Sequence, residues 1–378
     1  MESIRFNVSD VLTKLKQVVG VIESKPSTLE IFSCVHIFVK DGTLHLKSSD
    51  GETWVGVKIL EPSPIVEKID FCVNGKDFAQ ILSNLVGIEV TLEVDYEKKM
   101  VNGKYGRKGK FSLPIKDGSE FVDEPTNDTT PSTKQVIGET IKRGIELTEG
   151  SVANDELRPI MNGIHIEFTK EKIDFASSDG KKLTSFTSYN VKNDDEAEGG
   201  FTLPLKPARI LSQFALMEDI IEMSYTEKSI SFVAYDWVVT TRLCVGNYPN
   251  YRAVIPKEWV RSVVCDKNEI LSTLNRIMPL GNKESRLVKM KLCKDEMMLQ
   301  AEDIDYSTSA EEAITCEYDG DDFIIGFKGD ALMQILKNIN CDKVVIGLNE
   351  NNKAGVFIPH TQEEKTSSYV SILMPMQL

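Results

Sequence analysis

The sequence predicts an α+β fold built three times along one chain, and an internal repeat indicates it. The tetrapeptide Ser48-Ser49-Asp50-Gly51 returns as Ser177-Ser178-Asp179-Gly180, about a third of the chain further on. Each copy lies between runs of alternating apolar residues, where Asp-Gly is a strong hairpin signal because glycine adopts positive φ without steric cost. A degraded third copy fits at Met298-Leu299-Gln300-Ala301-Glu302-Asp303. A hairpin that recurs at near-equal spacing predicts a tandem repeat of whole domains.

Length and composition agree with three soluble domains. A third of the 378 residues falls within the usual domain size of about 100–150 residues. The hydrophobic content of 41% and the charged content of 27% are ordinary for a globular protein. No apolar run reaches about 18 residues, and the N-terminus lacks the apolar core of a signal peptide. We therefore expect a cytoplasmic protein.

The cysteines and histidines predict neither disulfides nor a metal site. The seven cysteines are scattered, odd in number and never arranged as CxxC, which is typical of reduced thiols in a cytosolic protein. The four histidines have no metal-ligand spacing. We expect no cofactor.

The first half of each copy reads as a strand followed by a helix. Alternating apolar residues from Ile4 to Val8 predict a strand, and Ser9-Asp10 predict the N-cap of an amphipathic helix. In the last third, Asp266 and Glu269 have the spacing of a capping box.

The second halves align still better. Phe71–Lys76, Phe201–Lys206 and Phe323–Lys328 each predict a short strand that meets a helix, with a lysine five residues after the phenylalanine. Further strand-like runs follow each helix. One copy is thus two helices and several antiparallel strands, an α+β domain.

The predicted domains are 1–127, 128–250 and 251–378. The segment from Glu120 to Thr133 is polar and rich in Pro, Thr and Asp, which is typical of a linker. The second junction, Val245 to Pro256, carries Tyr248 and Tyr251. We expect the second and third domains to pack more closely there.

No pattern of residues predicts catalysis. The sequence has no GxSxG, HExxH or Walker loop, and Gly103–Lys110 lacks the spacing of a phosphate-binding loop. We interpret that run as a basic hairpin between Val94 and Phe111. Asp50 and Asp179 have no histidine, cysteine or second carboxylate placed to assist them, so turn chemistry is the better interpretation. We do not expect an enzyme.

The charge pattern favours a local basic surface on an acidic protein. A net charge of −14 excludes a protein whose whole surface binds nucleic acid, but it permits a basic lining. Lys76, Lys206 and Lys328 recur near predicted helix starts, where the macrodipole disfavours a cation, and this indicates a use. Equivalent helices would present them to a phosphate backbone without reading sequence. Further candidates on the first helices are Lys14, Lys16, Lys142, Arg143 and Arg276.

The C-terminus is unusually apolar, running Ile372 to Leu378. A final strand accounts for the sequence up to Leu373. Methionines on both sides of a proline are typical of an adaptable apolar wall on which different peptides dock.

Together, the three repeats, the segment Tyr248–Pro256 and the tail Met374–Leu378 closely resemble the bacterial DNA polymerase III β subunits, the sliding clamps, over the whole length. The resemblance implies three tandem clamp domains and a ring-shaped head-to-tail homodimer that encircles double-stranded DNA without catalysis. It also implies partners that insert a short apolar peptide into a cleft. These are the polymerase III alpha subunit, the clamp loader and other proteins with a clamp-binding motif.

The resemblance also implies three sets of site residues. The peptide cleft between the second and third domains would comprise Arg158, Met161, Ser178, Gly180, Lys181, Lys182, Leu183, Pro249, Val254, Ile372, Met374, Pro375, Met376 and Leu378. The dimer interface would comprise Lys108, Lys110, Phe111 and Leu113 on one side, and Leu280, Glu311 and Glu312 on the other. Lys25 would join the DNA-binding set.

Four residues depart from the family pattern at the cleft: Lys181, Lys182, Ala253 and Gln377. These changes leave the apolar pocket intact and put its polar rim and partner preference in question. Two other hypotheses stay open. A non-ring adaptor would share the cleft but remain monomeric, and an enzyme with a repeated α+β fold would show substrate turnover.

Overall fold

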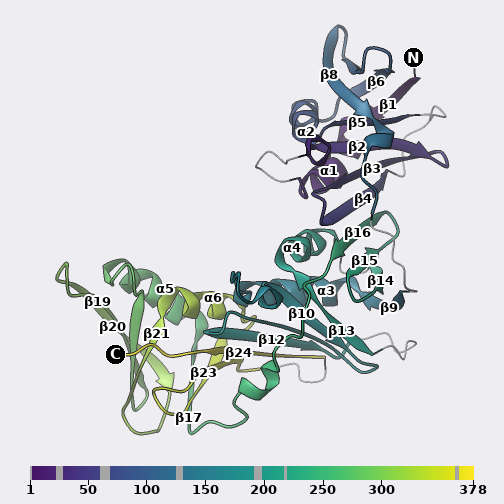
Figure 1. The fold of residues 1–378 in the computed structure, drawn as a ribbon. Coiled ribbons are helices and arrows are strands. Elements are labelled where there is room, and N and C mark those ends of the chain that lie inside the picture. Colours follow the sequence, from purple (N-terminus) through teal and green to yellow (C-terminus); the bar gives the residue numbers. More distant parts are fainter. Residues whose placement is uncertain are drawn as a thin grey trace. The chain divides into compact units, whose positions relative to one another are not determined.

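The computed structural model describes residues 2–22, 29–59, 69–124, 131–190, 198–216, 219–361 and 366–378. They form two compact units. The first unit comprises Met1–Lys142 and Lys206–Leu243, and the second comprises Arg143–Leu205 and Cys244–Leu378. Each contains one twelve-stranded sheet (Figure 1). The middle third of the chain thus contributes strands to both units.

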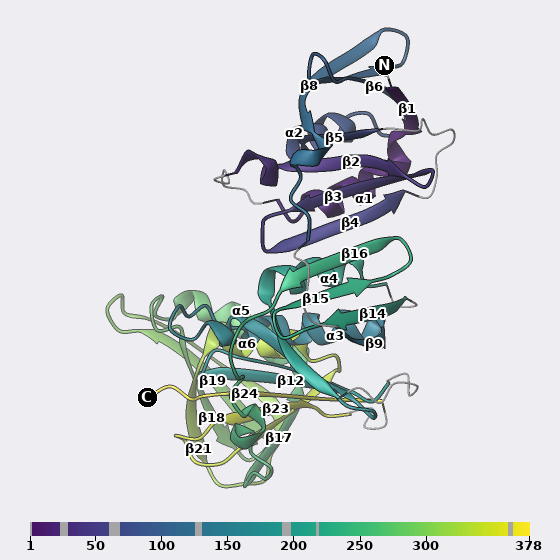
Figure 2. The same cartoon turned by 45° about the vertical axis from the view of Figure 1, so that its right-hand side comes forward.

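The sheet of the first unit has the order β1-β6-β7-β8-β5-β2-β3-β4-β16-β15-β14-β9, with antiparallel neighbours (Figure 2). Its strands are β1 (Glu2–Asn7), β2 (Cys34–Lys40), β3 (Thr43–Ser49), β4 (Thr53–Ile59), β5 (Asp70–Asn74), β6 (Glu89–Asp95), β7 (Met100–Tyr105), β8 (Gly109–Asp117), β9 (Ser132–Ile137), β14 (Ile220–Tyr225), β15 (Ser229–Val233) and β16 (Trp237–Arg242). Its helices are α1 (Val8–Val19), α2 (Gly75–Ser83) and α4 (Leu205–Phe214), with short 3₁₀ turns η1 (Glu30–Ser33) and η2 (Gly118–Glu120).

The sheet of the second unit has the order β13-β10-β11-β12-β24-β23-β22-β17-β20-β19-β18-β21, again antiparallel. Its strands are β10 (Gly163–Phe168), β11 (Ile173–Ser178), β12 (Lys182–Ser188), β13 (Gly199–Pro204), β17 (Arg261–Asp266), β18 (Leu287–Cys293), β19 (Glu296–Asp303), β20 (Thr308–Glu317), β21 (Phe323–Lys328), β22 (Lys343–Leu348), β23 (Gly355–Pro359) and β24 (Ser367–Leu373). Its helices are α5 (Lys267–Ile277) and α6 (Gly329–Asn338), and α3 (Gly138–Thr148) runs from the first unit into the second. Its 3₁₀ turns are η3 (Glu149–Ser151), η4 (Pro159–Met161), η5 (Tyr251–Val254) and η6 (Met278–Leu280).

The predicted repeat is confirmed and is finer than a threefold one. The order strand, helix, three strands occurs six times in the described residues, twice in each third of the chain. Each third therefore has two helices and eight strands, as an α+β clamp-like domain requires. None of the described helices has both the length and the apolar content needed to cross a membrane.

Helix starts follow local capping chemistry. Asn7 caps α1, because its side chain accepts a hydrogen bond of 2.9 Å from the N–H of Ser9. The predicted cap at Ser9-Asp10 is wrong by two residues. The helix begins earlier because Asn7, in an extended conformation at the end of β1, already accepts the hydrogen bond from the N–H of Ser9. Asp266 caps α5 as predicted, accepting from the N–H of Glu269 at 2.9 Å.

The Ser-Ser-Asp-Gly turn has the same hydrogen bonds in both copies. Asp50 Oδ1 accepts from the N–H groups of Glu52 and Thr53 at 3.0 and 2.7 Å. Asp179 Oδ1 accepts from two N–H groups, both at 2.8 Å. The glycines that follow have φ of 91° and 84°, which an L side chain rarely adopts. Both aspartates are thus turn residues, as predicted.

The degraded third copy keeps the aspartate and loses the glycine. Asp303 Oδ1 accepts from the N–H groups of Asp305 and Tyr306 at 3.1 and 3.3 Å. The positive φ, 53°, moves to Ser307. All three thirds therefore make an aspartate-supported hairpin, although residues 304–307 give the third a longer turn.

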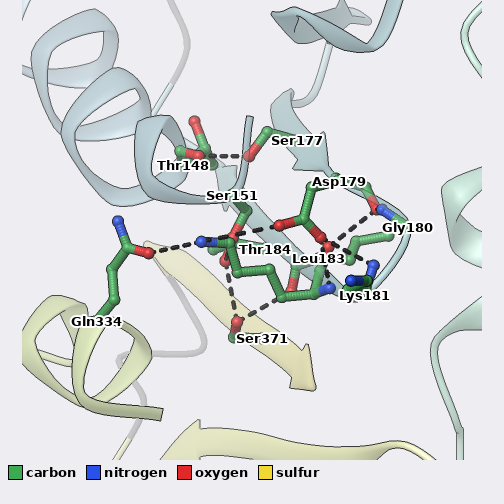
Figure 3. Close-up of polar contacts among 12 residues, drawn as sticks. Thr148, Ser151, Ser177, Asp179, Gly180, Lys181, Leu183, Thr184, Gln334 and Ser371 are labelled. Atoms are coloured by element: carbon green, nitrogen blue, oxygen red, sulfur yellow. Dashed lines mark hydrogen bonds and ion pairs between the residues drawn. The ribbon is translucent and has the colours of Figure 1, made fainter. Parts of the chain in front are cut away.

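A buried serine ties the first two hairpins to the preceding helix. Ser48 Oγ donates to the carbonyl of Val18 at 2.6 Å, and Ser177 Oγ donates to the carbonyl of Thr148 (Figure 3). Carbonyls at helix C-termini lack a partner in the next helical turn. Ser177 supplies one to Thr148, and Ser48 adds to the N–H of Val21, which also reaches Val18 at 3.3 Å.

Both sheets continue from one third of the chain into the next. In the first unit, β4 pairs with β16, so that Thr53 lies opposite Thr241. In the second unit, β12 pairs with β24, so that Lys182 lies opposite Leu373. In each case the strand that follows an aspartate turn pairs with the last strand of the next third.

The third pairing of this kind is missing from the described residues. β20 follows the Asp303 turn and pairs with β19, but its other edge meets β17 only at Cys316 and Glu317. β8, the last strand of the first third, pairs with β7 over 109–114, but its other edge meets β5 only over 115–117. Two strand edges, 109–114 and 308–315, are therefore open within the described part of the chain.

Candidate functional site

The predicted cleft residues gather in the second unit, where the C-terminal tail leaves the sheet. The N–H of Met374 donates to the carbonyl of Lys181 at 2.7 Å, and the N–H of Met376 donates to the carbonyl of Gly326 at 2.8 Å. The tail is thus held on one side by the Asp179 turn and on the other by β21. Leu378 packs at the far end, over Gly326, where a Cβ would lie 2.8 Å from the leucine side chain.

A hollow of about 640 Å³ lies beside this tail. Five predicted residues line it: Lys181, Lys182, Met374, Pro375 and Met376. The sequence reasoning missed the rest, which are Asp179, Glu284, Ser285, Lys328, Asp330, Ala331, Gln334 and Leu373. Most of those lie on α6 or beside it, and no motif in that helix pointed to the cleft.

A second hollow of about 720 Å³ lies between the end of η5 with the segment after it and residues 349–354, and its lining includes Val254 and Met374. Met374 lines both hollows and is 44% exposed, so its side chain is an accessible apolar wall between them. A partner's apolar side chain would meet this methionine from either side.

The floor of the site is a packed apolar cluster. Leu183 and Ile372 lie opposite each other on β12 and β24 and are buried with Ala176, Tyr251 and Val356. These two predicted residues support the site from below and offer little surface themselves. Met161 is likewise buried.

The remaining predicted cleft residues lie on the rim. Ser178 Oγ accepts from the N–H of Gly180 at 3.1 Å and so shapes the turn. Arg158 and Pro249 are exposed. The Arg158 guanidinium pairs with Asp155 at 2.9 Å and lies near Gly180.

The junction formed by η5 and the residues just before it is fixed by aromatic packing and by ion pairs. The ring of Tyr248 stacks on His165 with centroids 4.6 Å apart. The Arg252 guanidinium pairs with Glu167 at 2.5 Å and with the buried Asp174 at 2.6 Å, and it covers the ring of Tyr251. The junction is thus packed on both the middle and the last thirds, as the sequence predicts.

Burial governs the electrostatics of this junction. It raises the pKa of Tyr248 to about 12 and lowers the pKa of His165. Burial alone would raise the pKa of Glu167, but the hydrogen bond and charge of Arg252 hold that pKa below its usual value. A neutral tyrosine, a neutral imidazole and an ionised pair thus fix the segment that carries Pro249 and Val254.

The three repeated lysines all lie near helix starts, as predicted, but they do not occupy one equivalent position. Lys76 and Lys206 are the second residues of α2 and α4, whereas Lys328 is the last residue of β21 and precedes α6. The matching position in α6 is Asp330. Lys206 donates to the carboxylate of Asp50, and Lys328 lines the hollow near Lys182. Burial lowers the pKa of Lys182, the charge of Asp179 partly opposes this, and the charge of Lys328 adds to the lowering.

The other predicted DNA-binding residues have varied surroundings. Lys14 pairs with Asp236 in the first unit. Lys142 and Arg143 are half-buried on α3, and the Arg143 guanidinium lies 5.4 Å from the centroid of Phe186. Lys76 is exposed, and Lys25 lies outside the described residues.

The predicted interface residues lie on the two open strand edges. On β8, Lys110 is exposed, while Phe111 and Leu113 point inward and are half-buried. The ring of Phe111 covers Gly103, where a Cβ would lie 2.1 Å from it. Lys108 is exposed in the turn before β8.

On β20, Glu311 is exposed, and Glu312 accepts hydrogen bonds from Arg276 at 2.9 Å and from Thr273 at 3.1 Å. The hydrogen bond from Arg276 lowers the pKa of Glu312. Leu280 is 43% exposed beside this edge. The sequence reasoning missed Ile304 and Tyr306, exposed apolar residues in the adjacent turn.

The described residues hold no group of three or more His, Cys, Asp or Glu placed to bind a metal ion. All seven cysteines carry free thiols.

Comparison with known proteins decides the family. The DNA polymerase III beta subunit N-terminal domain matches residues 3–123, the central domain matches 135–250 and the C-terminal domain matches 252–377. The chain belongs to the DNA polymerase III beta subunit family. Members of this family are non-catalytic processivity factors, so the chain is a sliding clamp subunit and not an enzyme.

Individual relatives agree over nearly the full length. The chain is 26% identical to the beta sliding clamp of Pseudomonas putida over 377 residues, covering 97% of this chain and 98% of the relative. It is 24% identical to the Escherichia coli beta sliding clamp over 379 residues, with the same coverage. The solved DnaN sliding clamp of Pseudomonas aeruginosa has the same fold, with a TM-score of 0.90, 21% identity and 100% of both chains covered. The solved beta subunit of Thermotoga maritima also has this fold, with a TM-score of 0.89, 22% identity and 100% of both chains covered.

The Arg252→Ala substitution tests whether the ion pairs fix the junction. It leaves the buried Asp174 carboxylate with one ion-pair partner, Lys172 at 2.8 Å, and with the hydrogen bond that Thr187 donates. We expect the free energy of unfolding to fall by about 1–3 kcal/mol, measured by denaturant unfolding. The matched control is Arg242→Ala, whose ion pair with Glu52 is exposed on both sides and contributes about 0–1 kcal/mol. Equal losses in the two variants would contradict the assignment.

Proposed function

We propose that two copies of this chain close head to tail into a ring that encircles double-stranded DNA. The single observation that carries this proposal is the pair of open strand edges, 109–114 and 308–315. An open edge presents unpaired N–H and C=O groups that template pairing with another chain. The two equivalent edges, on β4 and β12, are paired inside the chain. The remaining pair, β20 of one copy with β8 of another, completes the pattern.

The side-chain pattern of the two strands supports this pairing. Inward residues alternate with exposed ones at 109, 111 and 113 of β8 and at 308, 310 and 312 of β20. In an antiparallel pair, directly opposed residues share a face. Phe111 and Leu113 then share a face with Thr308 and Ala310, while Lys110 shares the outer face with Glu311. The contact uses different surfaces of each copy, and two such contacts close a ring.

The proposed ring has six domains, three from each copy, with boundaries at 1–127, 128–250 and 251–378. It acts in the cytoplasm. The family resemblance supports an arrangement with helices on the lining and sheets outside. A net charge of −14 keeps the outer body away from phosphate, and topology rather than affinity retains the protein on DNA.

The proposed DNA contacts are basic residues on the helices, together with Lys328 before α6 and Lys25 outside the described residues: Lys14, Lys25, Lys76, Lys142, Arg143, Lys206 and Lys328. These residues differ in whether a carboxylate of the chain already pairs with them. Lys142 and Arg143 lie on α3 with no carboxylate partner among the described residues, whereas Lys14 and Lys206 are paired with Asp236 and Asp50. Weak, salt-sensitive phosphate contacts permit sliding.

The proposed cleft receives short apolar peptides of the polymerase III alpha subunit, the clamp loader and other partners. Met374, Val254 and Pro249 offer exposed apolar surface above the floor of Leu183 and Ile372. Each partner side chain buried there contributes about 1.5–3 kcal/mol. Lys181, Lys182 and Lys328 make one wall of the hollow basic, which sets the polar preference of the site.

The ring predicts topological retention on DNA. After loading onto nicked circular DNA, the chain stays bound through a high-salt wash, because salt weakens phosphate contacts but does not open the ring. It runs off the same DNA once that DNA is cut to a linear form. Gel filtration of the protein–DNA complex measures both. Equal loss from the two substrates in salt would show an ordinary electrostatic binder.

The cleft predicts that Met374→Asp weakens peptide binding about tenfold or more, because it places a charge in an apolar wall. Fluorescence anisotropy with a labelled peptide carrying adjacent leucine and phenylalanine measures this. The control is Val233→Asp, at a residue 39% exposed on the first unit, which leaves affinity unchanged. Unaltered binding by the Met374 variant would place the peptide elsewhere.

The seam predicts that Leu280→Lys dissociates the dimer at micromolar concentration, since the seam would bury an unpaired charge. Analytical ultracentrifugation gives the mass of the species in solution. Leu216→Lys, at an exposed leucine of the first unit, is the control. A Leu280 variant that remains dimeric would show that Leu280 does not lie in the seam.

A further inference from the structure

The three aspartate turns differ in charge, and the difference follows the charge of the side chains that lie against each turn. The first turn is acidic, with Asp50 and Glu52. Both carboxylates receive a cation from the middle third of the chain: Lys206 of α4 pairs with Asp50, and Arg242 of β16 pairs with Glu52 at 3.5 Å. The turn is therefore closed by ion pairs along the strands that join β4 to β16.

The second turn reverses this charge. Lys181 stands where the first turn has Glu52, and Asp330 of α6 stands where α4 has Lys206. Asp179 and Asp330 do not pair with each other but with Lys182 and Arg286, at 3.9 and 2.9 Å. Between this turn and α6 lies the hollow of about 640 Å³. Loss of the closing pair thus accompanies an open site.

The third turn is acidic again, with Asp303 and Asp305. Within the described part of the chain, neither carboxylate forms an ion pair, and Asp303 Oδ2 has only a long hydrogen bond of 3.4 Å from Asn282. The turn therefore has the charge of the first turn without its cations. It precedes β20, whose edge is open.

The matching cation is in the first third of the chain. Lys76 is the second residue of α2, as Lys206 is of α4, and it belongs to the third of the chain that ends in β8. Where β4 meets β16, the lysine of α4 reaches the turn before β4. A β20–β8 pairing of the same geometry brings the lysine of α2 to the turn before β20.

We propose that Lys76 of one protomer forms an ion pair with the acidic turn Asp303–Asp305 of the partner subunit, at each seam of the ring. The contact repeats between copies the Lys206–Asp50 pair that each copy makes internally. It assigns Lys76 to the seam and removes it from the DNA-binding set. The proposal rests on the proposed ring.

A charge-reversal cycle tests the contact. Asp305 is exposed, so Asp305→Lys leaves intact the turn that Asp303 holds. Lys76→Glu and Asp305→Lys each raise the dimer dissociation constant about fivefold or more, because each opposes two like charges. The double variant recovers at least half of the loss on a logarithmic scale. Sedimentation equilibrium of the full chain measures all four proteins.

The matched control is Lys16→Glu, an exposed lysine on α1, which leaves the dissociation constant within about twofold of the wild type. A Lys76→Glu variant with an unchanged constant overturns the proposal, as does a double variant no tighter than the weaker single one. A wild-type chain that stays monomeric overturns the ring itself, so the two failures are distinguishable.

Zero-length carbodiimide cross-linking provides a second measurement, independent of variants. It joins an ammonium to a carboxylate only in direct contact. Mass spectrometry of the cross-linked dimer band is expected to find Lys76 joined to Asp303 or Asp305. A dimer in which Lys76 is joined only to other carboxylates overturns the proposal.

Discussion

The rest of this structure depends on the pairing of strand edges between consecutive thirds of the chain. Every strand edge carries N–H and C=O groups that need a partner or water. The chain satisfies this need at β4–β16 and β12–β24, and by doing so it joins two eight-stranded and two four-stranded sheets into two sheets of twelve strands. Because this bonding is backbone to backbone, it holds the thirds together whatever side chains the strands carry. Among the described strands, β1, β9, β13 and β21 end the two sheets. Of the edges equivalent to those that join consecutive thirds, only the ones on β8 and β20 have no partner in the described part of the chain, and they give the protein a polarity that a closed monomer would lack.

The aspartate turns act on top of that pairing. Their backbone role is the same in all three copies, since one carboxylate oxygen accepts two N–H groups each time. The neighbouring residues are then free to vary. A carboxylate at Glu52 draws in Arg242, while Lys181 at the same place leaves the surface basic. One scaffold thus yields a closed junction or an open one according to the charge of a few side chains.

Local chemistry explains which features could be predicted from the sequence. The Ser-Ser-Asp-Gly turn and the Asp266 cap depend on hydrogen bonds between residues two or three apart, so the local sequence predicts them. The partners of β4 and β12 could not be predicted, because Thr53 meets Thr241 and Lys182 meets Leu373 across long separations. The lysine repeat misled for a definite reason: Phe71 lies four residues before α2 begins at Gly75, whereas Phe323 lies six residues before α6 begins at Gly329. Alignment on phenylalanine therefore placed Lys328 two positions from its true counterpart in the helix frame, and it hid the fact that Lys328 lines the cleft.

The acidic charge of the chain has a consequence for how such a ring would work. A body with a net charge of −14 repels both DNA and a second copy of itself at long range. Residence on DNA then depends on how long the seam stays closed, and the seam must overcome the repulsion between two acidic protomers. Placing basic residues on β8 and acidic ones on β20 reduces that repulsion only where the edges meet. Screening by salt weakens both the general repulsion and the local attraction, so the lifetime of the seam is less sensitive to salt than phosphate contacts are. A ring built in this way remains closed under conditions in which its grip on DNA is loose enough to slide.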